Sequence, residues 1–307
     1  MKSAQSFQPT ESTPVMDFGP VRVLFGEKSG KYPDGNQVVV RGKTAMAAFD
    51  TPLSANRFPD ALAGADLALL SHIHEDHTAG LHLLTEAEVW VHESDVNAVR
   101  SLEGLMAHYG YEAHALEAMK SVVVDQFSFQ PRPDAKGYKD GQIWDLGGCQ
   151  VRAVHLPGHT GGHCALVVEP EGVAFIADID LSSFGPYYGD KCSSLSEFRS
   201  SLARVETMEA KVWVTSHHKG VITDRDEFLG LLKAFRSKLD TRAEEIQSTL
   251  SSKGHTAESL VGLGFLYPVG YKNEYSHDAE LRTIELHLEE LVERGQAVYE
   301  DGRYFAQ

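Results

Sequence analysis

Three histidines and an aspartate fall within six positions of this chain, in the segment HIHEDH at residues 72–77. The segment directly follows DLALLS, an apolar run of the kind that forms a buried strand. Imidazole and carboxylate groups at this density are typical of metal ligands, and a solvated histidine-rich loop is the alternative interpretation. The fold must therefore place the end of a buried strand where these side chains can converge.

Three later apolar runs also end in a residue that can bind a metal. VRAVHLPG leads to His159, VAFIA to Asp178 and KVWVTS to His217. When buried strands end side by side, ligands that are distant in sequence meet at one edge of the core. The three cysteines show no CxxC spacing, so the candidate ligands are imidazoles and carboxylates, which suit zinc and also iron or manganese.

The order of the apolar runs predicts a mixed strand and helix domain over residues 1–225. The first 20 or so residues are expected to form a loose arm, and VRVLFG and QVVVRG to form strands on either side of a turn. The long section between LMAHYG and IWDLGG carries Pro and Gly residues, and no regular element is assigned to it. Residues 226–307 are mostly helix formers that end in two short strands joined at Asp301-Gly302, which predicts a smaller helical, winged-helix-like domain.

The charge of the chain argues against nucleic acid as a partner. The net charge is −16, and residues 226–307 hold 9 Lys plus Arg against 15 Asp plus Glu, a balance of 9 − 15 = −6. A phosphate-binding surface normally has the opposite sign. No run reaches the roughly 18 apolar residues of a membrane-spanning helix, and the few cysteines suit a reducing compartment. We therefore expect a cytoplasmic protein with a small-molecule substrate and no membrane partner, whose C-terminal helices could form a homodimer interface.

The segment HIHEDH resembles the HxHxDH signature of the metallo-beta-lactamase superfamily, and later motifs follow in that family's order. LPGHTGGH resembles its GHTxG segment, DGQIWDLGG the preceding turn and strand, FIAD the strand of the bridging aspartate, and TSHHKGVI the final ligand loop. The resemblance spans about residues 20 to 225. It implies an α/β fold, the αββα sandwich of that superfamily, with the C-terminal helices as an extension.

The resemblance also implies a ligand set for two metals. His72, His74 and His159 would bind one metal, Asp76, His77 and His217 the other, and Asp178 both. Two positions stay open, because His218 can be aligned in place of His217 and Asp180 in place of Asp178. His163 is expected to support the site without binding metal, and the remaining nearby histidines are expected to be structural or supporting: His82, His92 and His155.

The implied chemistry is hydrolysis. Two divalent metals, most readily Zn²⁺, would lower the pKa of a shared water towards neutrality, and Asp76 would orient that water and take its proton. Tyr187 follows the bridging-aspartate strand, so its phenol could hydrogen-bond a substrate carbonyl, whereas packing of Tyr187 and Tyr188 under a loop is the alternative. The leading hypothesis is a hydrolase of a small ester, thioester, lactone or lactam.

Two other activities of the same fold remain as alternatives. An endoribonuclease or phosphodiesterase is suggested by the helical C-terminal unit, but its negative charge opposes RNA binding. A persulfide dioxygenase shares much of the motif set and uses one iron held by two histidines and an aspartate, whereas this chain keeps the ligands of a second site. A metal-dependent binding module is the non-enzymatic alternative.

Overall fold

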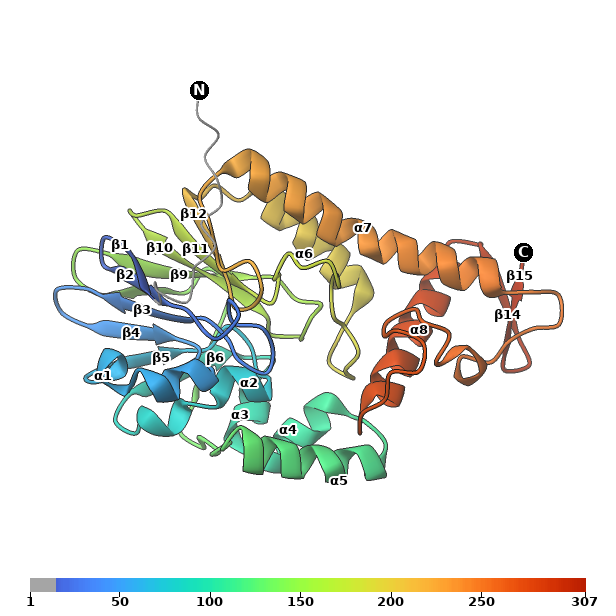
Figure 1. The fold of residues 1–307 in the computed structure, drawn as a ribbon, viewed down its shortest axis with the longest axis horizontal. Coiled ribbons are helices and arrows are strands. Elements are labelled where there is room, and N and C mark those ends of the chain that lie inside the picture. Colours follow the sequence, from blue (N-terminus) through green and yellow to red (C-terminus); the bar gives the residue numbers. More distant parts are fainter. Residues whose placement is uncertain (1–14) are drawn as a thin grey trace.

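Two β-sheets packed face to face form the centre of the molecule, and helices cover their outer faces (Figure 1). A computed structural model describes residues 15–307. The first sheet has seven strands, which are antiparallel from β1 to β4 and parallel from β4 to β7. Across this sheet its strands are β1 (Val15–Phe18), β2 (Val21–Leu24), β3 (Gln37–Arg41), β4 (Met46–Phe49), β5 (Leu67–Leu69), β6 (Glu88–His92) and β7 (Lys136–Tyr138).

The second sheet has six strands and carries three of the strand ends that the sequence singles out. It is antiparallel except where β11 pairs with β12. Across this sheet the strands are β13 (Val221–Ile222), β12 (Val212–Thr215), β11 (Val173–Ala177), β10 (Cys164–Glu169), β9 (Gln150–His155) and β8 (Ile143–Asp145).

Alternation along the strands builds three buried layers. In β11, Val173 and Phe175 pack between the two sheets, while Ala174 and Ile176 face the helices outside. Both faces of the strand are buried, which explains why VAFIA is an unbroken apolar run. The helices on the first sheet are α1 (Pro59–Leu62), α2 (Glu75–Thr78), α3 (Val96–Arg100), α4 (Leu102–Tyr109) and α5 (Ala113–Ser121), with 3₁₀ turns at Leu53–Arg57 and Leu81–Leu83. Helices α6 (Leu195–Thr207) and α7 (Arg225–Thr249) cover the second sheet.

The structure corrects two expectations about irregular segments. The predicted loose arm lies outside the described residues up to position 14, but Val15–Phe18 is strand β1, which pairs with β2. The section between LMAHYG and IWDLGG contains helix α5, a π-helical turn at Val122–Gln126 and strand β7. Helix α5 was missed because it buries only Ala115 and Met119, which is too little for a clear apolar stripe.

The C-terminal region consists of helices and one hairpin, as the sequence predicts. After α7 come a 3₁₀ turn (Glu258–Leu260), helix α8 (Ser276–Glu293) and strands β14 (Ala297–Glu300) and β15 (Arg303–Ala306). Asp301 and Gly302 join the strands with positive φ angles of 48° and 76°, as a tight hairpin turn requires. None of the helices in residues 15–307 is long and apolar enough to cross a bilayer.

Candidate metal centre

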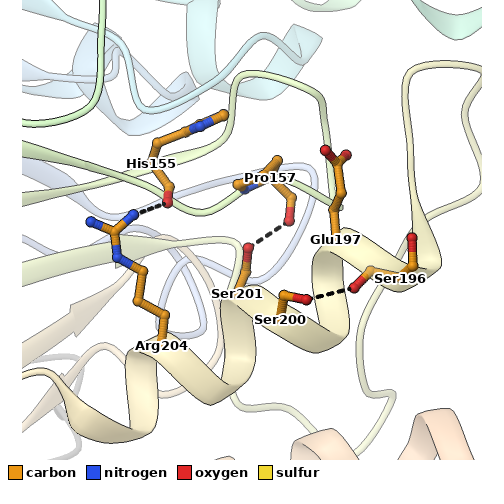
Figure 2. A pocket seen from close by; sticks show the side chains of 7 residues that line it. All are labelled: His155, Pro157, Ser196, Glu197, Ser200, Ser201 and Arg204. Carbon is orange, nitrogen blue, oxygen red and sulfur yellow. Dashed lines mark hydrogen bonds between the residues drawn. The ribbon is translucent and has the colours of Figure 1, made fainter.

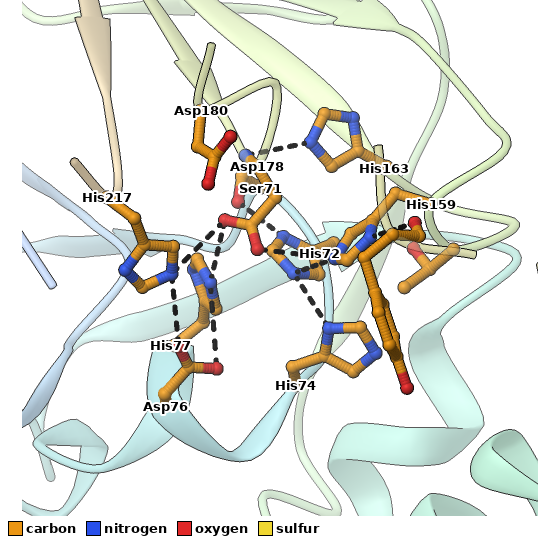
Figure 3. A network of polar contacts seen from close by, with 12 residues as sticks. Ser71, His72, His74, Asp76, His77, His159, His163, Asp178, Asp180 and His217 are labelled. Atoms are coloured by element: carbon orange, nitrogen blue, oxygen red, sulfur yellow. Dashed lines mark hydrogen bonds and ion pairs between the residues drawn. The ribbon is translucent and has the colours of Figure 1, made fainter. Parts of the chain in front are cut away.

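The candidate ligands come from five segments that meet at one edge of the sandwich (Figure 3). His72 and His74 lie in the loop after β5, and Asp76 and His77 lie on the short helix α2 that follows. The other three follow strand ends of the second sheet: His159 after β9, Asp178 after β11 and His217 after β12. All seven are largely buried, which costs free energy for polar side chains unless they are hydrogen-bonded, paired with an opposite charge or bound to a metal.

The first group is formed by His72, His74 and His159. His72 Nε2 lies 3.2 Å from His74 Nδ1 and 3.2 Å from His159 Nε2. Asp178 completes the group, because its Oδ2 is 3.4 Å from His159 Nε2. Ligand atoms about 2.0–2.1 Å from a tetrahedral ion stand about 3.3 Å apart. The spacing therefore fits one metal ion held by three imidazoles and a carboxylate.

The second group is formed by Asp76, His77 and His217. His217 Nε2 lies 3.1 Å from Asp76 Oδ2, and His77 Nε2 lies 3.1 Å from Asp178 Oδ1. The same Asp178 oxygen is 3.5 Å from His217 Nε2. Each oxygen of Asp178 thus faces a different group of ligands.

Two buried atoms in this cluster lack a hydrogen-bond partner. They are His77 Nε2 and Asp178 Oδ1, which lie 3.1 Å apart as an ion pair. Buried polar atoms are nearly always satisfied, so atoms left over in this way indicate a ligand that they share. The residues present therefore fit a metal ion at this position, and the donor set of nitrogen and oxygen suits zinc, iron or manganese.

The outer ring nitrogens of the histidines are held by other parts of the chain. His77 Nδ1 lies 2.8 Å from Asp50 Oδ2, His159 Nδ1 lies 2.9 Å from the Tyr187 carbonyl oxygen, and His217 Nδ1 lies 2.7 Å from the Gly30 carbonyl oxygen. A carbonyl can only accept, so the proton sits on the outer nitrogen of those rings. A metal can then bind the inner nitrogen and displace any proton that this nitrogen carries in its absence.

His74 is held in the reverse way, with Nδ1 turned inward and Nε2 turned outward. Its Nε2 lies 2.8 Å from Oδ2 of Asp190, which is completely buried. Behind Asp178, the Nε2 of His163 accepts the Asp178 backbone N–H at 3.3 Å, and its Nδ1 lies 3.1 Å from the Leu156 carbonyl oxygen. His163 therefore lies in a supporting position.

Burial and the neighbouring charges shift the pKa values of the candidate ligands in opposite directions. Burial alone would raise the pKa of the Asp178 carboxyl, but His77 and His217 outweigh it and hold that pKa well below its usual value. Burial would lower the pKa of His217, but Asp178 and Asp76 outweigh it and raise that pKa to about 10. The cluster thus favours a carboxylate at Asp178 and positive charge beside it, which a cation can also provide.

The two alternative ligands that the sequence left open, His218 and Asp180, lie apart from the other candidate ligands. His218 Nε2 lies 3.5 Å from Asp180 Oδ2, apart from the ligand groups, and its side chain is 34% exposed. Asp180 Oδ1 accepts the Ser182 backbone N–H at 2.9 Å, and burial raises the pKa of its carboxyl to about 7. His217 and Asp178, rather than their neighbours, lie beside the other ligand atoms.

A sequence profile of the metallo-beta-lactamase superfamily matches residues 62–218, which is half of the chain. The chain belongs to the metallo-beta-lactamase superfamily. Among curated relatives, it is 23% identical over 226 residues to an atrochrysone carboxyl ACP thioesterase of Pseudocercospora fijiensis and 26% identical over 244 residues to one of Aspergillus novofumigatus. Over 172 residues it is 26% identical to an acyl-coenzyme A thioesterase of Gallus gallus.

These relatives are longer than the aligned region. The alignments cover 74%, 76% and 48% of this chain but 56%, 64% and 59% of the three relatives, so the chain spans a little over half of their length.

Two solved structures share the fold at low identity. A metallo-beta-lactamase family protein of Thermus thermophilus has a TM-score of 0.67 at 22% identity, covering 94% of this chain and 99% of that one. A beta-lactamase domain protein of Burkholderia ambifaria has a TM-score of 0.69 at 20% identity, covering 95% and 94%.

A cavity of about 620 Å³ opens beside the ligand groups of this metallo-beta-lactamase fold. It is lined by His74, His159 and His217 together with Asp76 and Asp178. Seven of the chain's eleven tyrosines also line it. They are Tyr32, Tyr109, Tyr111, Tyr187, Tyr267, Tyr271 and Tyr275.

The two tyrosines that the sequence left open have different surroundings. The hydroxyl of Tyr187 lies at the cavity, 3.2 Å from Asp190 Oδ1 and 3.0 Å from the hydroxyl of Tyr111. Tyr188 is completely buried, and its hydroxyl lies 2.8 Å from His287 Nε2. Tyr188 is therefore a packing residue, whereas Tyr187 can reach a ligand in the cavity.

Several site residues were missed from the sequence. Glu75 faces the cavity and accepts hydrogen bonds from the hydroxyls of Tyr32, at 3.0 Å, and of Tyr109. It stands inside HIHEDH, so its neighbours could have drawn attention to it. Asp50 directly follows strand β4 and could have been found as another polar residue at a strand end. Asp190 has no comparable signal in the sequence.

A second, shallower cavity of about 390 Å³ lies between the loop after β9 and helix α6 (Figure 2). Its donors are already engaged by the chain, since Arg204 Nη1 donates to the His155 carbonyl oxygen at 2.9 Å and Ser201 Oγ to that of Pro157 at 2.7 Å. None of the seven predicted metal ligands lines it. The cavity beside the ligand groups is therefore the candidate substrate site.

Proposed function

We propose that this chain is a two-metal hydrolase that cleaves acyl thioesters of small molecules. The observation that carries the proposal is the position of Asp178, with Oδ2 beside His159 of one ligand group and Oδ1 beside His77 and His217 of the other. A carboxylate shared in this way suits two metal ions a short distance apart.

The seven predicted ligands would hold the two ions, and zinc is the ion that we expect first. When bound, two such ions supply a hydroxide near neutral pH and polarise the carbonyl that it attacks. Iron and manganese suit the same nitrogen and oxygen donors, so they remain alternatives.

Asp76 is proposed as the residue that orients the attacking water and takes its proton. Burial would raise the pKa of Asp76, but the neighbouring His77 and His217 outweigh it and lower that pKa. The side chain is therefore a carboxylate, which can accept a proton. Tyr187 is proposed to donate its phenol hydrogen to the substrate carbonyl oxygen, for which it would turn away from Asp190.

Thioesters are favoured among the possible substrates by the curated relatives, because those named above are thioesterases of acyl-carrier protein or acyl-coenzyme A substrates. The cavity supports a small substrate, since about 620 Å³ holds one acyl group with part of its thiol carrier. The excess of acidic residues opposes RNA, as a phosphodiester backbone would meet repulsion. A mononuclear iron dioxygenase needs only one group of metal ligands. The presence of a second group in this chain therefore argues against that activity.

The proposal is tested by metal analysis and thiol release on the purified protein. We expect two metal ions per chain and hydrolysis of N-acetylcysteamine thioesters, with both lost in His74→Ala and His159→Ala. His114→Ala is the matched control, because His114 is exposed on α5, and it should keep metal and activity. Two bound metals without thiol release from any thioester would refute the proposal, and oxygen uptake with a persulfide would replace it by the dioxygenase alternative.

A further inference from the structure

The rings around the cavity form a continuous stack that starts at the ligand groups. His74 stacks on Tyr109 at 5.7 Å between ring centroids and an interplanar angle of 5°. Tyr109 then stacks on Tyr111 at 5.7 Å and 21°, and Tyr111 on Tyr275 at 6.0 Å and 4°. One wall of the cavity is therefore made of nearly parallel rings and ends in the C-terminal region.

The segment between the last 3₁₀ turn and α8, residues 262–275, supplies a second set of rings. Tyr267 stacks on Tyr271 at 4.9 Å and 21°, and Phe184 lies 6.1 Å from Tyr267. Tyr271 is 50% exposed and Phe184 39% exposed, although both line the cavity. Large apolar side chains left open at a cavity mouth mark a binding surface.

This C-terminal segment is fixed at its base. The carboxylate of Glu280, buried on α8, accepts the backbone N–H of Gly262 at 2.9 Å and that of Leu266 at 3.3 Å. Leu266 packs in the core between the first sheet and its helices. At the other end of the segment, the carboxylate of Asp278 accepts the backbone N–H of Glu112 at the start of α5 at 2.7 Å. The rings of the segment are thus held in place against the superfamily fold.

The two inner tyrosines are already engaged by the chain, because their hydroxyls are hydrogen-bonded and their faces are stacked on other rings. Tyr109 donates to Glu75 and Tyr111 to Asp190. Both of these acidic side chains line the cavity. The open rings are Tyr271 and Phe184, and they favour a flat group, because offset stacked rings attract each other beyond the burial of apolar area.

We propose that residues 262–275, through Tyr267 and Tyr271, form the acyl-binding wall of the site and select a planar aromatic acyl group. The proposal rests on the proposed thioester hydrolysis and names its substrate class. It also gives the C-terminal extension a part in substrate selection.

The test compares three N-acetylcysteamine thioesters, with 2-naphthoyl, decanoyl and acetyl groups, in the metal-loaded wild type and in Tyr271→Leu. Leucine keeps apolar bulk but removes the flat ring. We expect the ratio of kcat/KM for 2-naphthoyl over decanoyl to fall about tenfold, which corresponds to about 1.4 kcal/mol. The acetyl thioester has neither a ring nor a long chain, so it gives the reference rate for each variant. Tyr299→Leu is the matched control, because Tyr299 is 55% exposed on strand β14.

A binding measurement separates this inference from the proposed function. Saturation-transfer NMR with 2-acetonaphthone and 2-decanone, two neutral ketones, reports binding without turnover. Weaker binding of 2-acetonaphthone alone in Tyr271→Leu supports the acyl wall even if no thioester is cleaved. Hydrolysis with an unchanged ratio in Tyr271→Leu, and unchanged ketone binding, overturns the acyl wall and leaves the hydrolase in place.

Discussion

The Asp50 carboxylate lies 2.8 Å from Nδ1 of His77 and also accepts two hydrogen bonds from Ser71, from its backbone N–H and from its hydroxyl. Ser71 Oγ is in turn 3.0 Å from His72 Nδ1. One carboxylate outside the predicted ligand set therefore orients a histidine of each ligand group. Asp50 has a positive φ of 51°, a conformation that costs free energy and that is concentrated at functional sites.

Replacing Asp50 should lower the affinity for metal more than it lowers the stability of the fold. We expect Asp50→Ala to lower metal affinity by roughly 10–100-fold, the usual effect of removing a residue that orients a metal-binding histidine. Competition with a chromogenic chelator measures the affinity, and excess zinc should restore activity. Asp60→Ala, at an exposed position on α1, should leave the affinity unchanged. Equal affinities in the two variants would show that Asp50 does not orient the ligands.

Arg242 should be important for stability although it lies away from the cavity. It is buried on α7, and it donates to the carbonyl oxygens of Phe184, at 2.8 Å, and of Pro186. We expect Arg242→Met to lower the free energy of unfolding by about 3 kcal/mol, because it leaves buried acceptors unsatisfied. Denaturant unfolding measures this change. Arg236→Met removes an exposed arginine of the same helix and should cost less than about 1 kcal/mol. Similar losses in both variants would contradict the expectation.

Gly158 allows the loop that carries His159 to pack on α6. A Cβ atom added at Gly158, which has φ of 133°, would lie 2.3 Å from Cα of Phe198. We expect Gly158→Ala to destabilise the protein by more than about 3 kcal/mol, from the clash and the positive φ together. Gly141→Ala is the control, because Gly141 has φ of 78° but no atom near the added Cβ. Its cost should be about 1–2 kcal/mol, from backbone strain alone. Thermal unfolding compares the two, and equal costs would argue against the clash.

His287 should make the fold sensitive to acid. Burial, with a contribution from Arg242, Arg199 and Arg294, lowers its pKa to about 3. Below the unfolded pKa of about 6.5, the unfolded chain takes up a proton that the folded chain cannot, so stability falls as the pH drops from about 6.5 towards 3. From pH 7 to pH 5 this group alone should cost about 2 kcal/mol.

The acid effect is measured as a difference between variants. Denaturant unfolding in the presence of a chelator, at pH 7 and pH 5, should show a smaller loss of stability in His287→Gln than in the wild type. His277 is the control on the same helix, because Asp278 raises its pKa and its stabilisation is present at low pH and lost as the pH rises. His277→Gln should therefore not reduce the acid sensitivity. If His287→Gln loses as much stability between pH 7 and pH 5 as the wild type does, His287 is not the group that makes the fold sensitive to acid.

The sequence predicts the fold and the place of the metal ligands because both depend on local signals. HIHEDH follows a buried strand, and His159, Asp178 and His217 each follow another, so the order of the strands is enough to bring them together. The profile match and the two sheets confirm the superfamily and its sandwich. The assignment of each ligand, and of Tyr187 as a catalytic residue, stays a prediction.

The residues that the sequence did not predict depend on tertiary contacts. Asp190 meets His74 across 116 positions of the chain, and Tyr275 meets Tyr111 across the junction with the C-terminal region. No periodicity or motif encodes such pairs. Strand β1 was missed for a related reason, since four residues without an alternating pattern become a strand only by pairing with β2.

Helix α7 starts at the predicted domain boundary but belongs to the cores on both sides of it. Phe228, Leu232, Phe235 and Leu239 pack under the second sheet, while Ile246 packs with α8 and the hairpin. At about 1.5 Å per residue, its 25 residues form one rod roughly 37 Å long. Neither region can melt without disturbing a helix that the other needs. Heat should therefore unfold the whole chain in a single cooperative transition, and a chain ending at residue 225 would lose part of its own core.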